Sequence, residues 1–314
     1  MADRIALGVD LGGTKTEAVV VRLDPLTELA RLRVPTERDL GYEAVLAGTA
    51  EAVRRAAQMA GVDLARVPLG VGMPGSITRR EGVVKNSNTV CLNGRPFRQD
   101  LARTLGHSIA FDNDANCFAL AEAELGAARE HRAGVVFGVI LGTGVGGGLV
   151  LGGRIWSGLH GIGGEWGHHA VWAGAPDARG CYCGQRGCLE SYASGPAVEA
   201  HYARLSGTRR PLAEVATRRE SDPHAKAAIE TLLDTFGRAM ANLIDILDPS
   251  AVVLGGGVSN LDALYTEGVA RVGQYVFNDE LATPIVKHAI GDSAGVLGAA
   301  LLALAEGESP RAAG

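Results

Sequence analysis

The sequence predicts an α/β protein made of two related domains, and three observations favour this class. Predicted strands alternate with predicted helices along most of the chain. Residues 5–21 and 135–151 align without a gap, and each segment reads as an apolar strand, a glycine turn and a second apolar strand. The chain has 314 residues, more than one compact domain usually holds. We therefore expect a duplicated fold with two facing glycine turns, although chance similarity between two glycine-rich hairpins is the alternative.

In the first half, helices are recognised by spacing and by end signals. Apolar residues such as Val45, Val53 and Ala57 recur at helical spacing, and Pro96 and Gly106 bracket a short helix. We predict helices at residues 42–60, 96–105 and 115–123, and strands at residues 5–11, 18–23, 30–34, 67–71 and 109–111.

The second half begins with the repeated hairpin at residues 135–151 and continues into a loop rich in glycine and cysteine at residues 158–187. We predict strands at residues 251–254 and 285–287, and helices at residues 196–205, 212–219, 223–248, 260–275 and 294–306.

Composition excludes several classes of function. The net charge is −5 without a block of Lys or Arg, which argues against nucleic acid or anionic lipid as the main partner. Residues 133–153 are uncharged and long enough for a membrane span, but nine of the 21 are glycine, so we expect no span. The chain opens without a secretory signal pattern, and we expect a cytoplasmic protein.

Glycine is unusually frequent, with 44 residues, about twice the usual share of roughly 7%. The run from Gly8 to Lys15 resembles a P-loop, and Gly142, Gly144 and Gly147 fit the dinucleotide fingerprint. In both places a strand follows the turn, whereas these motifs require a helix. We therefore predict two phosphate-binding hairpins and no Rossmann fold, because bare backbone N–H groups can approach an anion closely.

Two acidic positions follow strands. Asp10 interrupts an apolar strand just before the first glycine turn, where a carboxylate is well placed to hold Mg²⁺; a turn-capping role is the alternative. Asp114 lies in the polar run 112–116 at a strand-to-helix junction. It is either a helix N-cap or a carboxylate that accepts a hydroxyl proton while Asn113 orients a polyhydroxylated substrate.

Cysteine spacing indicates a metal site. His168, Cys181, Cys183 and Cys188 form the pattern H-x12-C-x-C-x4-C, which can complete a closed, structural zinc shell. His169 is a competing ligand, although its side chain would point elsewhere. The odd count of five cysteines argues against a disulfide framework. Glu165 and Glu190 are tethered to this loop, and surface positions are the alternative for both.

Six segments together resemble the ROK family of sugar kinases and repressors. They are GVDLGGTK (8–15), DNDAN (112–116), LGTGVGGG (141–148), GEWGH (164–168), CYCGQRGCLE (181–190) and VLGGGVS (253–259). The resemblance implies the two-lobed actin/hexokinase-like ATPase fold, with duplicated ribonuclease H-like domains and a zinc-bearing loop. It implies a small lobe at residues 1–118 plus about 292–314 and a large lobe at residues 119–291. Only four residues precede Ile5, so we do not expect the helix-turn-helix of the family's repressors.

The resemblance also implies roles for individual residues. Asp114 would be the general base, and Asp10 would serve Mg²⁺. The sugar pocket would be lined by Asn88, Asn113, Glu165, His168 and Glu190, so that His168 serves both zinc and sugar. The first phosphate turn would comprise Gly12, Gly13, Thr14 and Lys15, and the second Thr143, Gly144, Gly146, Gly147 and Gly148. Gly255, Gly256 and Gly257 would lie near the adenosine.

The expected activity is transfer of the γ-phosphate of ATP to the 6-hydroxyl of a hexose. Within the family, segments 82–97, 112–120 and 291–300 look most like bacterial fructokinases and mannokinases, so fructose is the expected substrate, with possible activity on mannose or glucose. The alternatives are an N-acetylglucosamine kinase or a glucokinase, and, outside enzymes, an inactive sugar sensor. The implied cofactors are structural Zn²⁺ and Mg²⁺ with ATP, and the implied assembly is a homodimer.

Overall fold

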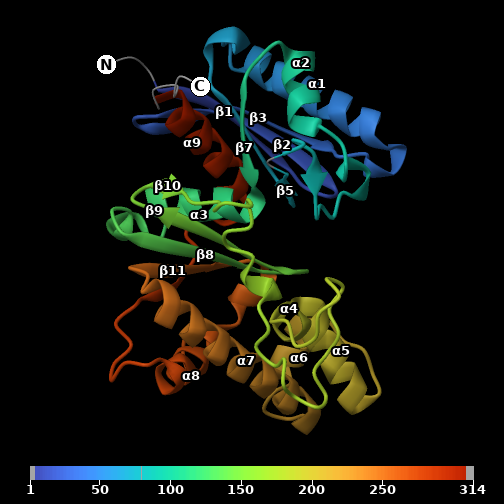
Figure 1. Cartoon of the computed structure of the whole chain (residues 1–314), viewed down its shortest axis with the longest axis vertical. Helices are drawn as coiled ribbons and strands as arrows, with labels where there is room; N and C mark the ends of the chain where they lie inside the picture. Colours follow the sequence, from blue (N-terminus) through green and yellow to red (C-terminus); the bar gives the residue numbers. More distant parts are fainter. Residues whose placement is uncertain (1–3, 79, 309–314) are drawn as a thin grey trace. The chain divides into compact units, whose positions relative to one another are not determined.

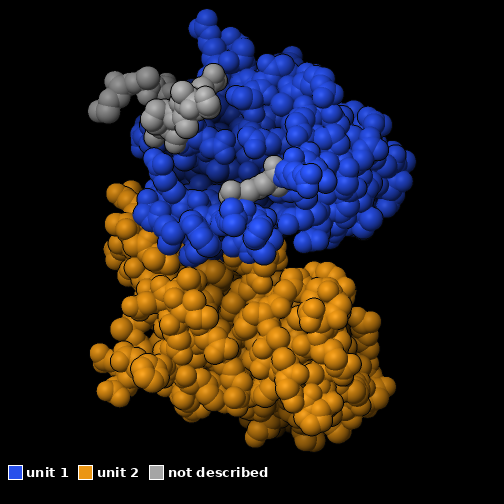
Figure 2. All heavy atoms as spheres, in the orientation of Figure 1, with its two compact units in different colours: residues 1–126, 148–163, 290–314 blue, residues 127–147, 164–289 orange. Residues whose placement is uncertain are grey.

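The computed structural model describes residues 4–78 and 80–308 and divides the chain into two compact units (Figures 1 and 2). Unit 1 comprises residues 1–126, 148–163 and 290–314, and unit 2 comprises residues 127–147 and 164–289. These units differ from the predicted lobes mainly at residues 119–126 and 148–163. One reason is that α3 (Asp114–Glu124) is a continuous helix, which a boundary at residue 118 would divide.

The sheet of unit 1 has five strands in the order β3-β2-β1-β4-β7. Strands β1 to β3 form an antiparallel meander, β4 pairs parallel to β1, and β7 pairs parallel to β4. The strands are β1 (Ile5–Leu11), β2 (Lys15–Leu23), β3 (Leu26–Pro35), β4 (Leu69–Met73) and β7 (Ile109–Asn113). A small hairpin, β5 (Ser76–Ile77) and β6 (Val84–Lys85), follows β4.

The two faces of this sheet are covered by different helices. Leu7, Val9 and Leu11 belong to a core cluster shared with α1 (Tyr42–Met59) and α2 (Phe97–Leu105). The alternating residues, Gly8 and Asp10, face α9 (Ala294–Glu308), which also packs against α3. Asp10 is therefore directed toward the start of the last helix of the chain.

The second sheet repeats this topology, with the order β10-β9-β8-β11-β12. Strand β8 has the same sequence of buried and partly exposed residues as β1, and it pairs parallel to β11, which pairs parallel to β12. The strands are β8 (Val135–Leu141), β9 (Val145–Leu151), β10 (Arg154–Ile155), β11 (Ala251–Gly255) and β12 (Ile285–Lys287). The shared topology confirms the predicted duplication.

Unit 2 also contains a group of helices, and α5 and α7 among them begin with a side-chain cap. Ser194 caps α5 by accepting from the N–H of Ala197, and Asp222 caps α7 by accepting from the N–H groups of His224 and Ala225. The helices are α4 (Glu190–Ala193), α5 (Gly195–Ser206), α6 (Leu212–Thr217), α7 (Pro223–Leu247) and α8 (Glu267–Tyr275). Short 3₁₀ turns lie at residues 38–40, 64–66, 90–92, 129–131, 166–168, 257–260, 262–264 and 291–293.

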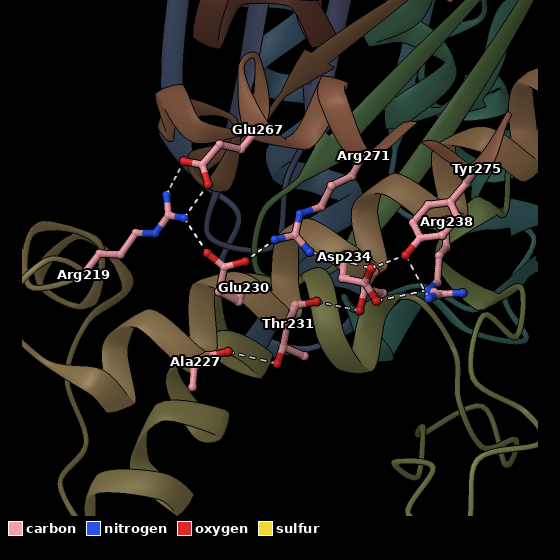
Figure 3. Close-up of polar contacts among 10 residues, drawn as sticks. Arg219, Ala227, Glu230, Thr231, Asp234, Arg238, Glu267, Arg271 and Tyr275 are labelled. Atoms are coloured by element: carbon pink, nitrogen blue, oxygen red, sulfur yellow. Dashed lines mark hydrogen bonds and ion pairs between the residues drawn. The ribbon is translucent and has the colours of Figure 1, made fainter. Parts of the chain in front are cut away.

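The contact between α7 and α8 is polar along one side (Figure 3). Glu230 on α7 accepts from Arg219, which precedes the helix, and from Arg271 on α8. One turn further along α7, Asp234 accepts from the Tyr275 hydroxyl at 2.6 Å. The guanidinium of Arg238 lies over the rings of Tyr275 and Trp172, at 4.3 and 4.9 Å from their centroids. These charges fix how α8 lies on α7.

Most predicted elements form within a few residues of their predicted bounds, and one prediction is wrong in part. The helix predicted at residues 260–275 begins only at Glu267, because two 3₁₀ turns occupy residues 257–260 and 262–264. Residues 133–153, the segment with the length of a membrane span, form the β8–β9 hairpin. Within the described chain, no helix combines the length and apolar character needed to cross a membrane.

Candidate active site

The first glycine turn of unit 1 is closed by backbone and side-chain hydrogen bonds. The N–H of Gly12 donates to the carbonyl of Lys15 at 3.0 Å, and the Thr36 hydroxyl donates to the carbonyl of Gly12 at 2.7 Å. A Cβ atom at Gly13 would lie 3.2 Å from Nη1 of Arg38 and 3.5 Å from Oδ1 of Asn88. The structure therefore brings Asn88 to the predicted phosphate turn. It also places Thr36 and Arg38 there, two residues that no motif of the sequence indicates.

Asp10 lies at the end of β1, beside this turn. A Cβ at Gly295, in the first turn of α9, would lie only 2.9 Å from Oδ2 of Asp10, so only glycine fits there without a shift. Burial, together with the nearby carboxylates of Asp114 and Glu17, raises the pKa of Asp10 from its usual 3.8 to about 7. A half-buried carboxylate near like charges is a site where a divalent cation would relieve repulsion, so the residues present fit Mg²⁺.

The junction between β7 and α3 assigns the capping role to a residue other than Asp114. Asn113 is the N-cap of α3, and its side-chain oxygen accepts from the N–H of Ala115 at 2.8 Å. Its amide donates to the carbonyl of Gly75 at 2.9 Å. Asp114 is the first residue of the helix and is half-buried. The N-cap is therefore Asn113, and Oδ1 of Asp114 accepts from the same N–H of Ala115, at 2.9 Å.

Asp112 is held more firmly than its neighbours. Its Oδ1 accepts from the Asn116 amide at 2.7 Å, and its Oδ2 accepts from the Ser157 hydroxyl at 2.8 Å. Together with Asn113 it borders a polar cavity of about 430 Å³ within unit 1, which is also lined by Ser76, Thr78, Arg98 and Gln99. The Ser76 hydroxyl is buried and makes no hydrogen bond within the described chain. The lining of this cavity thus includes one hydroxyl, that of Ser76, without a partner in the described chain.

In unit 2, Glu190 packs onto the second glycine turn. The N–H of Gly142 donates to the carbonyl of Gly144 at 2.9 Å, and the N–H of Val145 donates to Oε2 of Glu190 at 2.8 Å. A Cβ at Gly144 would lie 2.7 Å from the same carboxylate oxygen, so this glycine allows the contact. Glu190 therefore has a definite position at the turn and is not a freely exposed side chain.

The third glycine run follows β11. Gly256 has a φ of 81°, and a Cβ there would overlap the carbonyl of Leu141 at the end of β8. Gly255 is buried, whereas Gly256 and Gly257 are exposed. The run thus reaches the base of the second glycine turn within unit 2, and Thr143, Gly144 and Gly146 lie at the surface of that turn while Gly147 and Gly148 are buried.

The predicted metal ligands come together in unit 2. One ligand atom from each of His168, Cys181, Cys183 and Cys188 can be chosen so that all lie within 4.8 Å of one another. The Sγ of Cys181 lies 3.6 Å from Nδ1 of His168, and the Sγ atoms of Cys183 and Cys188 are 3.6 Å apart. Sulfur atoms bound to one zinc at about 2.3 Å in a tetrahedron would be about 3.8 Å apart, so the cluster fits Zn²⁺.

The neighbours of this cluster distinguish the two histidines. Nε2 of His168 contacts the Tyr182 hydroxyl at 3.0 Å, while His169 turns away and contacts the carbonyl of Trp166 at 2.6 Å. Burial raises the pKa of Cys188 to about 12, so a cation is needed to favour its thiolate at neutral pH. Glu165 lies in the segment leading to His168 and is half-buried.

Comparison with known proteins identifies the family. A sequence model described as the ROK family matches residues 6–306. An N-acetyl-D-glucosamine kinase of Yersinia pseudotuberculosis is 38% identical over 307 residues, covering 95% of this chain and 99% of the relative.

Solved structures agree with the fold. A ROK hexokinase from Thermus thermophilus has a TM-score of 0.86 at 36% identity, covering 97% of this chain and 99% of that one. A ROK glucokinase from Streptomyces griseus, solved with glucose and AMPPNP, has a TM-score of 0.76 at 28% identity, covering 96% and 99%.

These relatives confirm the actin/hexokinase-like fold. For the sugar substrate, they support the alternatives given above and not the expected first choice. The predicted first choice, fructose, finds no support among these three kinases, whereas the alternatives, N-acetylglucosamine and glucose, do. With a family match over 301 of its residues, from 6 to 306, the chain belongs to the ROK family and is one of its ATP-dependent sugar kinases.

Proposed function

We propose that the chain phosphorylates the 6-hydroxyl of N-acetylglucosamine with ATP. The observation that carries this choice of sugar is the 38% identity, over almost the whole chain, to an N-acetyl-D-glucosamine kinase. Glucose is the nearest competitor, because the S. griseus relative is a glucokinase. Fructose stays a second candidate, resting on the resemblance of residues 82–97 to fructokinases.

Asp114 is the proposed general base. It accepts the proton of the 6-hydroxyl while that oxygen attacks the γ-phosphorus, the bond to the bridging oxygen breaks, and ADP leaves. Its half-buried place at the first turn of α3 suits this role, because Asn113 is the N-cap of the helix and a carboxylate can accept a hydroxyl proton. The family resemblance implies that the sugar hydroxyls are oriented by Asn88, Asn113, Glu165, His168 and Glu190.

The phosphates of ATP would bind at the backbone of the two glycine turns, Gly12–Lys15 and Thr143–Gly148, with Gly255–Gly257 nearer the adenosine. Asp10 would hold Mg²⁺ directly or through water. When bound, this ion neutralises charge on the transferred phosphoryl group. The remaining task of the protein is positioning, which dominates catalysis of phosphoryl transfer.

Zinc would be held by His168, Cys181, Cys183 and Cys188 and would order the loop that carries Glu165 and leads to Glu190. Because all four positions would be filled by protein atoms, the ion has a structural role. A homodimer is implied by the family resemblance and can be checked by sedimentation.

A coupled kinase assay across N-acetylglucosamine, glucose, mannose and fructose tests the proposal. We expect kcat/KM for N-acetylglucosamine to exceed the values for the other three sugars by at least about tenfold, since a site built to hydrogen-bond a substituent discriminates strongly against sugars without it. A higher kcat/KM for fructose would reject the choice of sugar and favour the second candidate. Binding of sugar with no turnover of any of the four would reject a kinase activity toward these hexoses and favour the sensor alternative.

A further inference from the structure

Arg38 lies against the first glycine turn, although no motif of the sequence singles it out. A Cβ at Gly13 would have Nη1 of Arg38 as its nearest neighbour, at 3.2 Å, and Oδ1 of Asn88 next, at 3.5 Å. All three residues belong to unit 1. A guanidinium group therefore lies at the point where the proposed phosphate turn meets a proposed sugar-binding side chain.

The local chain geometry holds Arg38 in this place. The N–H of Thr36 donates to the carbonyl of Thr14 at 3.1 Å, and its hydroxyl donates to the carbonyl of Gly12, so the end of β3 is fixed to the turn. Glu37 then adopts a left-handed conformation with a φ of 53°, which is uncommon for a residue other than glycine. This conformation starts the 3₁₀ turn Arg38–Leu40, which ends at Gly41. Such an unusual backbone is typical of functional sites.

The charge of Arg38 is not balanced at close range. Within the described chain, its ion pair is with the adjacent Asp39, at 3.9 Å, and the Asp39 side chain is 97% exposed. An ion pair of this length in water contributes little. The guanidinium keeps its charge at any working pH and presents several donors in one plane, which suits phosphate oxygens. Lys15, also exposed, adds a second positive charge at the turn.

We infer that Arg38 binds the terminal phosphate of ATP and stabilises its charge during transfer. The inference rests on one part of the proposed function, which is that the turn Gly12–Lys15 binds the phosphates of ATP. In the transfer step, a bond forms between the sugar oxygen and the γ-phosphorus, and the bond to the bridging oxygen of ADP breaks. The sugar proton passes to Asp114, while Arg38 exchanges no proton and donates hydrogen bonds to the phosphoryl oxygens.

The competing explanation is structural: Arg38 merely supports Asn88 and the turn. The two explanations differ in what they require. A phosphate ligand needs the positive charge, whereas a support needs only the length and volume of the side chain. Arg38→Met keeps length and removes charge, and Arg38→Lys keeps charge but loses the planar fork.

The experiment compares Arg38→Met, Arg38→Lys and a control, Arg66→Met. Arg66 is a matched control because it also lies on a 3₁₀ turn and pairs with a nearby exposed Asp, here Asp63 at 3.4 Å. We expect Arg38→Met to lower kcat/KM for ATP at least about 10²-fold, the usual effect of losing one transition-state donor. The kcat/KM of Arg38→Lys for ATP should lie between the values of Arg38→Met and the parent, and that of Arg66→Met should equal the parent value. In all three variants the KM for the sugar should change less than about threefold.

Nucleotide binding gives a readout that does not depend on the sugar. Competition against a fluorescent nucleotide should show weaker binding of ATP to Arg38→Met and unchanged binding of AMP, which lacks the terminal phosphates. A loss of less than tenfold in kcat/KM for ATP, or equal weakening of ATP and AMP, would overturn the inference. If the parent protein phosphorylates a hexose other than N-acetylglucosamine, the proposed choice of sugar is wrong. The Arg38 variants are then compared with the parent on that hexose, so the inference about Arg38 is still tested. Circular dichroism of each variant verifies that it is folded.

Discussion

Asn113 and Asp114 divide two tasks at the first turn of α3. Asn113 caps the helix through the N–H of Ala115, and Asp114 follows it as the first helical residue. Because the cap is supplied by Asn113, Asp114→Asn should leave the helix, and thus the midpoint of thermal unfolding, nearly unchanged. As a general base it contributes about 10²–10⁴-fold, so kcat should fall by that range. Steady-state kinetics on the folded variant test this prediction. A variant kcat above about a tenth of the parent value would reject Asp114 as the general base.

Asp10 should make the protein less stable as the pH rises. Its pKa is about 7 in the folded state and about 3.8 ordinarily, so the folded state binds the proton more tightly. The stability linked to this proton is complete below about pH 4 and is lost as the pH rises through 7. Asp10→Asn carries no such proton. In the absence of Mg²⁺ and nucleotide, the difference in melting temperature between the variant and the parent should increase in favour of the variant as the pH rises from 5 to 8.

The same change should abolish most activity, since Asp10 is the proposed Mg²⁺ residue. We expect kcat/KM for MgATP to fall at least about 10²-fold. Asp39→Asn is the control for stability, because its side chain is 97% exposed and loses little solvation on folding. Equal pH dependence in the Asp10 and Asp39 variants would show that burial of Asp10 has no measurable effect.

At the scale of elements, the loop from His168 to Cys188 is expected to depend on zinc. Purified protein should contain about one zinc per chain by metal analysis, since three thiolates and one imidazole fill a tetrahedral shell. Cys183→Ser should lose the metal and raise KM for the sugar more than KM for ATP, because His168 belongs to this loop and Glu165 lies just before it. The half-buried Cys91 is not part of the cluster, so Cys91→Ser should retain zinc. Active parent protein that contains well under half an equivalent of zinc per chain would contradict the proposed zinc site.

The polar contact between α7 and α8 makes a testable contribution to stability (Figure 3). Glu230 bridges Arg219 and Arg271, whose side chains are only 16% and 26% exposed. Glu230→Ala leaves both guanidinium groups with fewer partners, and we expect it to lower the free energy of unfolding by about 1–3 kcal/mol.

Glu214 provides a matched control on α6. It also bridges two arginines, Arg210 and Arg218, but these are 31% and 44% exposed. Glu214→Ala should therefore cost less than about 1 kcal/mol. Urea unfolding of both variants gives the comparison, and equal losses would mean that burial of the arginines does not matter here.

The sequence predicts elements well where one local signal dominates and poorly where tertiary contacts decide. The strand at residues 5–11 is found because its residues are apolar and end at glycines, and α7 is found because Asp222 and Pro223 mark its start. The helix predicted from residue 260 starts at 267, since apolar spacing alone does not separate 3₁₀ turns from a helix.

The candidate site follows the same rule. Asp10, Asp114, the glycine turns and the four metal ligands could be picked from local pattern. Thr36, Arg38 and Gly295 could not, because each reaches its partner across 24, 25 or 285 residues of sequence through the packing of β3 and α9. No local motif records such contacts, so they require the structure.

At the scale of the whole molecule, unit 1 is built from both ends of the chain. Helix α9 returns to the first sheet and packs against β1, β4 and α3. The approach is close because glycines lie at each contact. A Cβ at Gly8 would overlap the carbonyl of Val296, one at Gly70 that of Ala299, and one at Gly298 that of Cys117. The stability of unit 1 thus depends on backbone contacts made by residues 181 to 288 positions apart.

Gly70→Ala tests this dependence. The added methyl group meets backbone atoms, which cannot rotate away, so β4 and α9 must separate, and we expect a loss of at least about 3 kcal/mol. Gly48→Ala is the control: it lies within α1 and a Cβ there would have nothing within 4 Å, so it should raise stability by up to about 1 kcal/mol. Hydrogen exchange should locate the effect of Gly70→Ala, with faster exchange in β1, β4, α3 and α9 and unchanged protection in α7 and α8. Because unit 2 has its own helices and its own part of the second sheet, faster exchange in α7 and α8 as well would show that the two units unfold together and that the loss cannot be assigned to the packing of α9 alone.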